Sequence, residues 1–115
     1  MASVNQTGPL SLLGDYSFDE KTVNIHPNDA YDLGLMTTRE TVKIFVGCTV
    51  EEFLQGSVEH TFGNLYLRNE TRVGTLEVSL KTATRLGRPK QARVLYFSGE
   101  EKYGRVLIQP VPANP

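Results

Sequence analysis

Residues 23–34 read VNIHPNDAYDLG, and residues 76–87 read LEVSLKTATRLG. A constant shift of 53 positions aligns the two stretches, so that their apolar positions coincide and Ala, Leu and Gly recur at matching places. Each stretch predicts a strand, then a helix of one to two turns, then a glycine that ends the helix in the left-handed conformation. We interpret the pair as an internal repeat, and therefore as two copies of one structural unit.

Strand-forming residues surround both copies. β-Branched and aromatic side chains favour strands, and they gather in seven segments, which are 16–18, 22–25, 41–46, 57–67, 73–80, 92–97 and 104–108. Gly63 interrupts the longest segment and indicates a bulge or bend. Thr49 and Glu52 form a capping box, which predicts a further short helix that ends at Gly56.

A single strand-helix-strand unit leaves its edges unpaired, whereas two interleaved units can close on each other. The sequence therefore predicts a mainly β fold, a small closed β-barrel made from two duplicated units with short helices. The units are expected at about residues 14–47 and 58–109, within a single domain over 14–109.

Both ends of the chain are expected to lie outside this barrel. Residues 1–13 contain the breaker Gly8-Pro9, and residues 110–115 contain three prolines. Proline cannot donate to a strand ladder and favours an extended path. We therefore predict extended N- and C-terminal arms.

Length and composition favour one soluble globular domain. The chain has 115 residues, of which 39% are hydrophobic and 22% charged. Cys48 is the only cysteine, which excludes an internal disulfide and a cysteine-built zinc site. No apolar run approaches the ~20 residues of a membrane-spanning helix, and the first residues lack the pattern of a signal peptide. We expect a cytoplasmic or virion protein that has no membrane partner and is not secreted through a signal peptide.

Charge is distributed unevenly along the chain. Residues 1–57 hold three bases and eight acids, whereas residues 58–115 hold nine bases and five acids, so the halves carry -5 and +4. Such an asymmetry can steer a charged partner or let copies of the chain attract one another. It predicts an acidic and a basic pole, and with them a protein partner or self-assembly. An unevenly charged solvated surface accounts for the pattern equally well.

Nucleophilic catalysis would need Cys48 with His26 or His60 as its base. Nothing in the sequence places these residues together, and a lone cysteine after an apolar strand is more often a small buried hydrophobe. His26 ends a strand, and Asn28 or Asp29 is expected to cap the following helix. The sequence shows neither paired metal-ligand spacing nor a glycine-rich phosphate loop. We predict no catalytic, metal or cofactor-binding residue, no cofactor, and no identifiable small-molecule ligand.

The densest basic stretch raises nucleic-acid binding as an alternative. Cations can contact phosphates, and three members of the stretch follow helical spacing. Aromatic residues that could stack on bases fall inside strand patterns and are expected in the core instead. The candidate nucleic-acid-binding residues are Lys81, Arg85, Arg88, Lys90 and Arg93.

The segment Ile25–Leu35, IHPNDAYDLGL, resembles the strand-to-helix element of the double-psi and related cradle-loop barrels. These include the C-terminal barrel of molybdopterin oxidoreductases and the dimeric AbrB-type DNA-binding hairpins. The resemblance covers both repeats. Such barrels usually carry a Gly-Asp turn before the return strand, where this chain has Met36–Glu40 and Arg88–Gln91. The resemblance implies a barrel fold, and with it either DNA binding or service as part of an enzyme.

Three function classes follow. The favoured one is a non-catalytic binding or assembly module that makes protein-protein contacts through its arms and charged poles, as a structural component of a virion (of the capsid decoration type) or of another particle. The second is a nucleic-acid-binding regulator of the AbrB-like type. The third is a barrel domain or small subunit of an enzyme. We expect an oligomeric protein that is not an enzyme, and the other two classes stay open.

Overall fold

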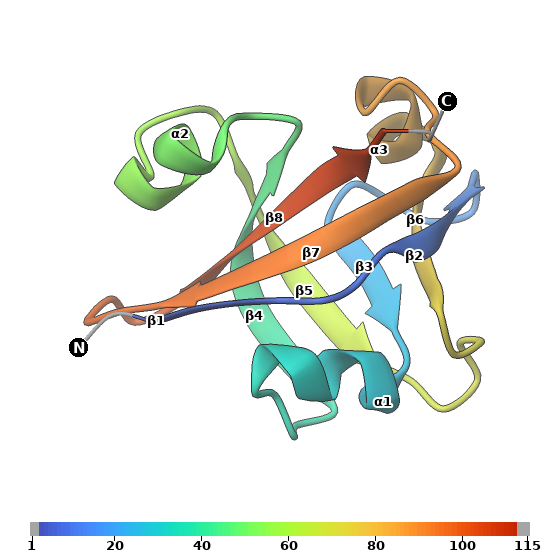
Figure 1. Cartoon of the computed structure of the whole chain (residues 1–115), viewed down its shortest axis with the longest axis horizontal. Coiled ribbons are helices and arrows are strands. Elements are labelled where there is room, and N and C mark those ends of the chain that lie inside the picture. The colour runs from blue at the N-terminus through green and yellow to red at the C-terminus, as the bar shows by residue number, and fades with distance from the viewer. Residues whose placement is uncertain (1–2, 113–115) are drawn as a thin grey trace.

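Eight strands form one sheet in the computed structural model, which describes residues 3–112. Seven of them close a barrel in the order β7-β2-β6-β3-β5-β4-β8, because β8 pairs again with β7 (Figure 1). The predicted small closed β-barrel is confirmed. The strands are β1 (Ser3–Gln6), β2 (Leu10–Asp15), β3 (Thr22–Ile25), β4 (Arg39–Val46), β5 (Thr61–Leu67), β6 (Thr75–Ser79), β7 (Gln91–Ser98) and β8 (Gly104–Val111).

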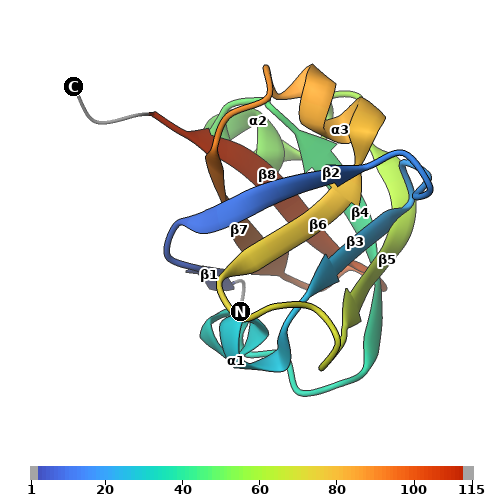
Figure 2. The ribbon, with the colours of Figure 1, turned by 90° about the vertical axis from the view of Figure 1, so that its right-hand side faces the viewer.

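Short helices lie at both ends of this barrel (Figure 2). At one end, α1 (Pro27–Ala30) runs on as the 3-10 turn η1 (Tyr31–Leu33). At the other end lie α2 (Val50–Gln55) and α3 (Leu80–Arg85). All three helices fall within a residue or so of the positions that the sequence predicts.

The predicted helix caps are present. Thr49 Oγ1 accepts a hydrogen bond from Glu52 N at 3.1 Å, and Thr49 N donates to Glu52 Oε1 at 3.0 Å. Gly34 and Gly87 have φ angles of 79° and 85°, so both repeats use a left-handed glycine at the end of their helix. The cap of α1 differs from the prediction. His26 is the capping residue, and its Nδ1 accepts from Asn28 N at 3.0 Å.

The two repeats lie side by side in the sheet. β3 and β6 are antiparallel, with Val23 opposite Val78, Asn24 opposite Glu77 and Ile25 opposite Leu76. Asn24 and Glu77 are 53 residues apart, so the central pair consists of equivalent positions of the two repeats. A local two-fold axis therefore passes between them.

The same shift relates the strands on either side of this pair. β2 runs parallel to β6, and β5 runs parallel to β3. Leu12 lies beside Leu76, just as Leu65 lies beside Val23. The duplication is thus visible in four strands and not only in the sequence.

The N-terminal segment corrects one prediction, because it belongs to the barrel. β1 pairs with β7, and β2 pairs with both β6 and β7. Between them, Thr7 N donates to Val94 O at 2.9 Å and Thr7 Oγ1 accepts from Val94 N at 3.1 Å. Gly8 and Pro9 therefore bend the chain between two strands on the same edge of β7, where the sequence suggested the end of an arm. The barrel begins before residue 14.

Three smaller corrections follow from local contacts. The strand expected at 16–18 is a turn, since Asp15 Oδ1 accepts from Ser17 N at 2.8 Å and from Ser17 Oγ at 2.6 Å. The C-terminal arm was expected to begin at residue 110, but Pro110 lies within β8, opposite Ala92. Residues 113–115 of the expected arm lie outside the described residues. Gly63 makes no bulge, because the pairing of β4 with β5 continues through it.

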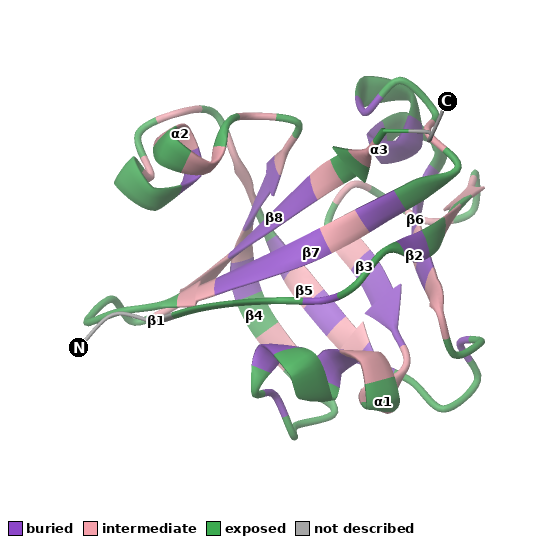
Figure 3. Ribbon diagram, viewed as in Figure 1, coloured by how far each residue is buried: buried purple, intermediate pink, exposed green. Residues whose placement is uncertain are grey.

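The core of the barrel consists of buried apolar residues, and Figure 3 shows buried positions along its strands. Strand residues alternate between this interior and the outer face, and on β7 and β8 both faces are buried. Val94 and Ile108 point inward, whereas Leu95 and Leu107 pack outside with Phe53 of α2. The outer cluster holds α2 against the barrel.

The N-terminal strand can be tested with two leucines on β2. Leu10 is 4% exposed and belongs to the core, whereas Leu13 is 50% exposed. We expect Leu10→Ala to lower the free energy of unfolding by about 2–5 kcal/mol, and Leu13→Ala to change it by no more than about 0.5 kcal/mol. Urea denaturation measures both. Equal effects of the two substitutions would show that residues 10–13 are not part of the barrel.

Candidate binding groove

The five basic residues predicted for nucleic-acid binding lie on α3, on the loop after it and on β7. Lys81 and Arg88 line a hollow beside α3, Lys90 lines a second one beside Pro89, and Arg93 lines a third beside Gly47. Arg85 is exposed in the last turn of α3. The hollows that contain Lys90 and Arg93 share Pro110 and Val111 in their linings. Binding of nucleic acid by these five residues stays a prediction.

The acidic and basic halves of the sequence are also not separate poles. β3 lies between β5 and β6, and β2 lies between β6 and β7, so the halves alternate around the barrel. Two of the salt bridges join them directly. Lys43 Nζ is 3.0 Å from Glu101 Oε2, and Lys81 Nζ is 3.4 Å from Glu20 Oε1. Strand pairing thus brings acidic and basic residues of the two halves together, which reduces the separation of charge across the molecule.

Within residues 3–112, neither candidate base is hydrogen-bonded to the candidate nucleophile Cys48. His26 caps α1, whereas Cys48 comes just before α2, which lies at the other end of the barrel (Figure 1). His60 stacks on Phe45, with ring centroids 4.8 Å apart, and its Nδ1 is 2.9 Å from Val58 O. Cys48 packs against the cluster under α2, where burial first and the Glu52 carboxylate second raise the pKa of its thiol. Within residues 3–112, no cluster of His, Cys, Asp and Glu could hold a metal ion.

The raised pKa of Cys48 has a measurable consequence. At pH 8, less of this thiol is ionised than in an unstructured peptide, so iodoacetamide should react with it more slowly. Glu52→Gln removes the negative charge but retains an amide oxygen that can still cap α2. We expect this variant to lower the thiol pKa and to speed the reaction. A Cys48 that reacts faster than a peptide thiol would contradict this account.

Two adjoining hollows at the α1 end form the strongest candidate site. The first, of about 470 Å³, lies between α1 and residues 35–38, and the second, of about 540 Å³, lies along the end of β5. Thr38, Leu67 and Asn69 line both. They therefore make one groove, with these three residues as its common wall.

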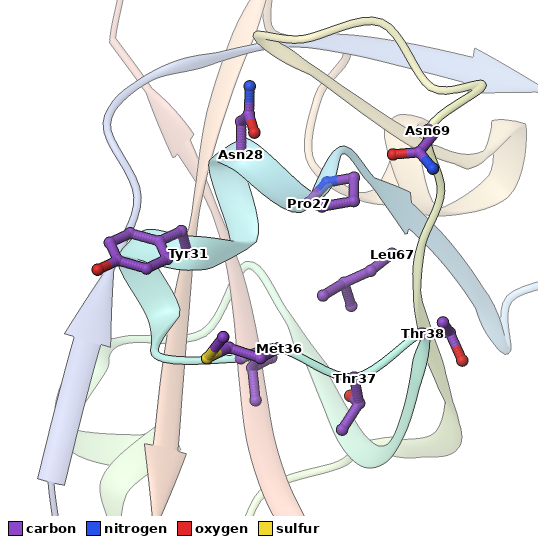
Figure 4. A pocket seen from close by; sticks show the side chains of 9 residues that line it. Pro27, Asn28, Tyr31, Met36, Thr37, Thr38, Leu67 and Asn69 are labelled. Carbon is purple, nitrogen blue, oxygen red and sulfur yellow. The ribbon is translucent and has the colours of Figure 1, made fainter.

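The first half of the groove is apolar (Figure 4). Leu35 and Leu67 are buried below it, and Pro27 of α1 forms one side. At the rim, Tyr31 is 71% exposed and Met36 is 87% exposed. Large apolar side chains left in water beside a hollow are typical of a binding surface.

The second half of the groove is cationic. Arg39 lies opposite Tyr66 in the pairing of β4 with β5, and the Arg68 guanidinium stacks over the Tyr66 ring, 4.7 Å from its centroid. Glu70 is the one acid of its lining. Among residues 3–112, neither arginine forms a salt bridge or donates a side-chain hydrogen bond, so both keep their donors for a ligand.

Backbone hydrogen bonds fix two walls of the groove. Leu67 N donates to Thr38 O at 3.0 Å, and Arg68 N donates to Ile25 O at 2.9 Å. From α1, Asp29 Oδ2 accepts from Gly74 N at 2.8 Å, which ties the helix to the loop between β5 and β6. Asp29 therefore has a structural partner in the loop between β5 and β6.

A buried polar contact holds that loop against the sheet. Glu77 Oε1 accepts from Thr71 Oγ1 at 3.0 Å and from Asn24 Nδ2 at 3.2 Å. Asn24 and Glu77 are the pair at the two-fold axis between the repeats. The groove is thus formed before any ligand binds, which reduces the entropic cost of binding.

The repeat provides an equivalent hollow at the α3 end. The shift of 53 positions carries Pro27, Asn28, Tyr31 and Leu35 onto residues that line this second hollow, which are Leu80, Lys81, Thr84 and Arg88. The same shift relates Tyr16, which lines the hollow at the α3 end, to Asn69, which lines the groove at the α1 end. The fold therefore builds two related hollows, and of these two only the one at the α3 end is lined by cations, Lys81 and Arg88.

Sequence reasoning missed the groove because its parts come from distant segments. A signal was present in the helix over 27–33, where Ala30 and Leu33 suffice to pack on the barrel and leave Tyr31 without a role in the core. Arg39 counted only toward net charge, and Arg68 counted as part of the densest basic stretch. Their approach depends on the register of β4 with β5.

Comparisons with known proteins found no match among family models, curated proteins or solved structures. The resemblance to cradle-loop barrels stays a prediction. Within the described residues, no helix is long and apolar enough to cross a membrane.

Proposed function

We propose that this protein is a non-catalytic binding module that takes a segment of a protein partner into the groove at the α1 end. The observation that carries the proposal is the exposure of Met36 and Tyr31 at the rim of a preformed hollow. A partner side chain that covers these residues removes apolar surface from water at little cost in ordering the groove.

The proposed function is still that of a non-catalytic binding or assembly module. Its contact surface is now the groove, where the sequence suggested the arms and the charged poles. Residues 3–6 and 10–15 are paired with other strands of the sheet, so they are not free to lie on a neighbour. The groove offers a partner both an apolar and a cationic region. Assembly into an oligomer, a virion or another particle would use this surface, and it stays part of the proposal.

The test is selection of peptides from a random display library on the immobilised full chain, followed by measurement of their affinities. We expect Met36→Asp to weaken the selected peptides by at least about tenfold, since it replaces a buried apolar contact with a charge. Tyr16→Asp is the matched control, because Tyr16 is also highly exposed but lies at the α3 end.

The control variant should bind the peptides as the unchanged chain does, and circular dichroism should show both variants folded. The proposal fails if no peptide is enriched. It fails equally if Met36→Asp and Tyr16→Asp have the same effect.

A second candidate function is binding of single-stranded nucleic acid at the α3 end. Tyr16 is 89% exposed and shares a hollow with Lys81 and Arg88. Exposed aromatic rings beside cations are the usual platform for stacked bases and phosphates. The salt bridge between Glu20 and Lys81 argues against nucleic-acid binding here, because it places a negative charge beside the cations.

Fluorescence anisotropy with oligothymidylate tests this second candidate. We expect binding at low salt that weakens as salt increases, and that is lost when Arg85, Arg88 and Lys90 are replaced by alanine. Met36→Asp is the control and should leave the binding unchanged. Absence of binding at low salt would remove nucleic acid from consideration.

A further inference from the structure

We propose that the segment bound in the groove carries an acidic side chain close to a large apolar one. This inference rests on the proposed function and specifies its ligand. The apolar side chain would enter the half lined by Tyr31, Leu35 and Met36, and the carboxylate would meet Arg39 and Arg68.

The first argument is the continuity of the groove. Thr38, Leu67 and Asn69 line both halves, so a ligand that fills one half extends directly into the other. An extended peptide places side chains on one face at every second residue, about 7 Å apart. An acidic and an apolar residue separated by one position therefore lie on the same face of such a segment.

The second argument is charge complementarity. Two arginines face a single acid, Glu70, in the cationic half. Stacking on Tyr66 orients the Arg68 guanidinium and leaves its N–H groups without an acceptor in residues 3–112. Guanidinium groups bind carboxylates through charge-assisted hydrogen bonds, often two at once.

The third argument favours a carboxylate over a nucleotide in this half. A nucleotide would need a free aromatic face on which to stack its base. One face of the Tyr66 ring is already covered by the Arg68 guanidinium, 4.7 Å from the ring centroid. The remaining aromatic residue of the groove, Tyr31, lies in the apolar half, away from the two arginines.

The experiment compares peptide selection on three forms of the full chain. The unchanged chain should enrich peptides in which Asp or Glu lies within about three residues of a large apolar residue. The double variant Arg39→Glu, Arg68→Glu should enrich basic residues at that position instead. The control Arg85→Glu, Lys90→Glu makes the same change of charge at the α3 end and should keep the acidic preference.

Measurements on one selected peptide sharpen this test. Replacing its acidic residue by the corresponding amide should weaken binding about tenfold at low salt, and by less at high salt. Should the charge-reversed chain fail to fold, the neutral variant Arg39→Gln, Arg68→Gln should lose the acidic preference in its place. Thermal denaturation establishes which variants are folded.

The outcomes separate the inference from the proposed function. Enriched peptides that need Met36 but show no acidic preference would overturn the inference and leave the proposed function standing. If inorganic phosphate or oligothymidylate displaces the peptide from the groove, the cationic half is a phosphate site and the carboxylate assignment is wrong. If no peptide is enriched at all, both fail together.

Discussion

The antiparallel pairing of β3 with β6 is the interaction on which the rest of the structure depends. It places Asn24 opposite Glu77 and brings the two copies of the repeated unit together about a local axis. Because side chains alternate along a strand, this register puts the neighbouring apolar residues inside the barrel and the central pair outside. β2 and β5 add to the two free sides of the pair in the same register, and β4, β7 and β8 complete the ring. Glu77 then holds the loop that forms one wall of the groove.

The candidate sites arise where the two copies differ. After the helix, the amide of Leu35 bonds to the carbonyl of Ala30 in the first copy, and the amide of Arg88 bonds to that of Ala83 in the second. The backbone hydrogen bond recurs, but the φ angle of Arg88 is 52° and that of Leu35 is not positive. Leu35 is buried and continues into the exposed Met36, whereas Arg88 is itself exposed. Duplication thus supplies two hollows of one design, and a few substitutions give them different chemistry.

The sequence was sufficient to predict what depends on local chemistry. Strand propensity, the capping box at Thr49 and the left-handed glycines are local, and the barrel follows from the repeat once its edges must be closed. Gly8-Pro9 led to the wrong prediction of an N-terminal arm. A strand breaker between two strands of one sheet has the same sequence pattern as a breaker at which the chain leaves the sheet. The groove and the mutual cancellation of charge depend on which distant strands pair, as Arg39 with Tyr66 shows, and no single stretch of sequence specifies that.

The register of β3 with β6 is most directly tested by nuclear Overhauser contacts between backbone protons of the two strands. The account predicts contacts that place Asn24 opposite Glu77, with Val23 opposite Val78 and Ile25 opposite Leu76. A register shifted by one residue would turn Asn24 toward the barrel interior and detach the loop that Glu77 holds. Contacts that pair Asn24 with Leu76 or with Val78, or no contacts between these strands, would contradict the account.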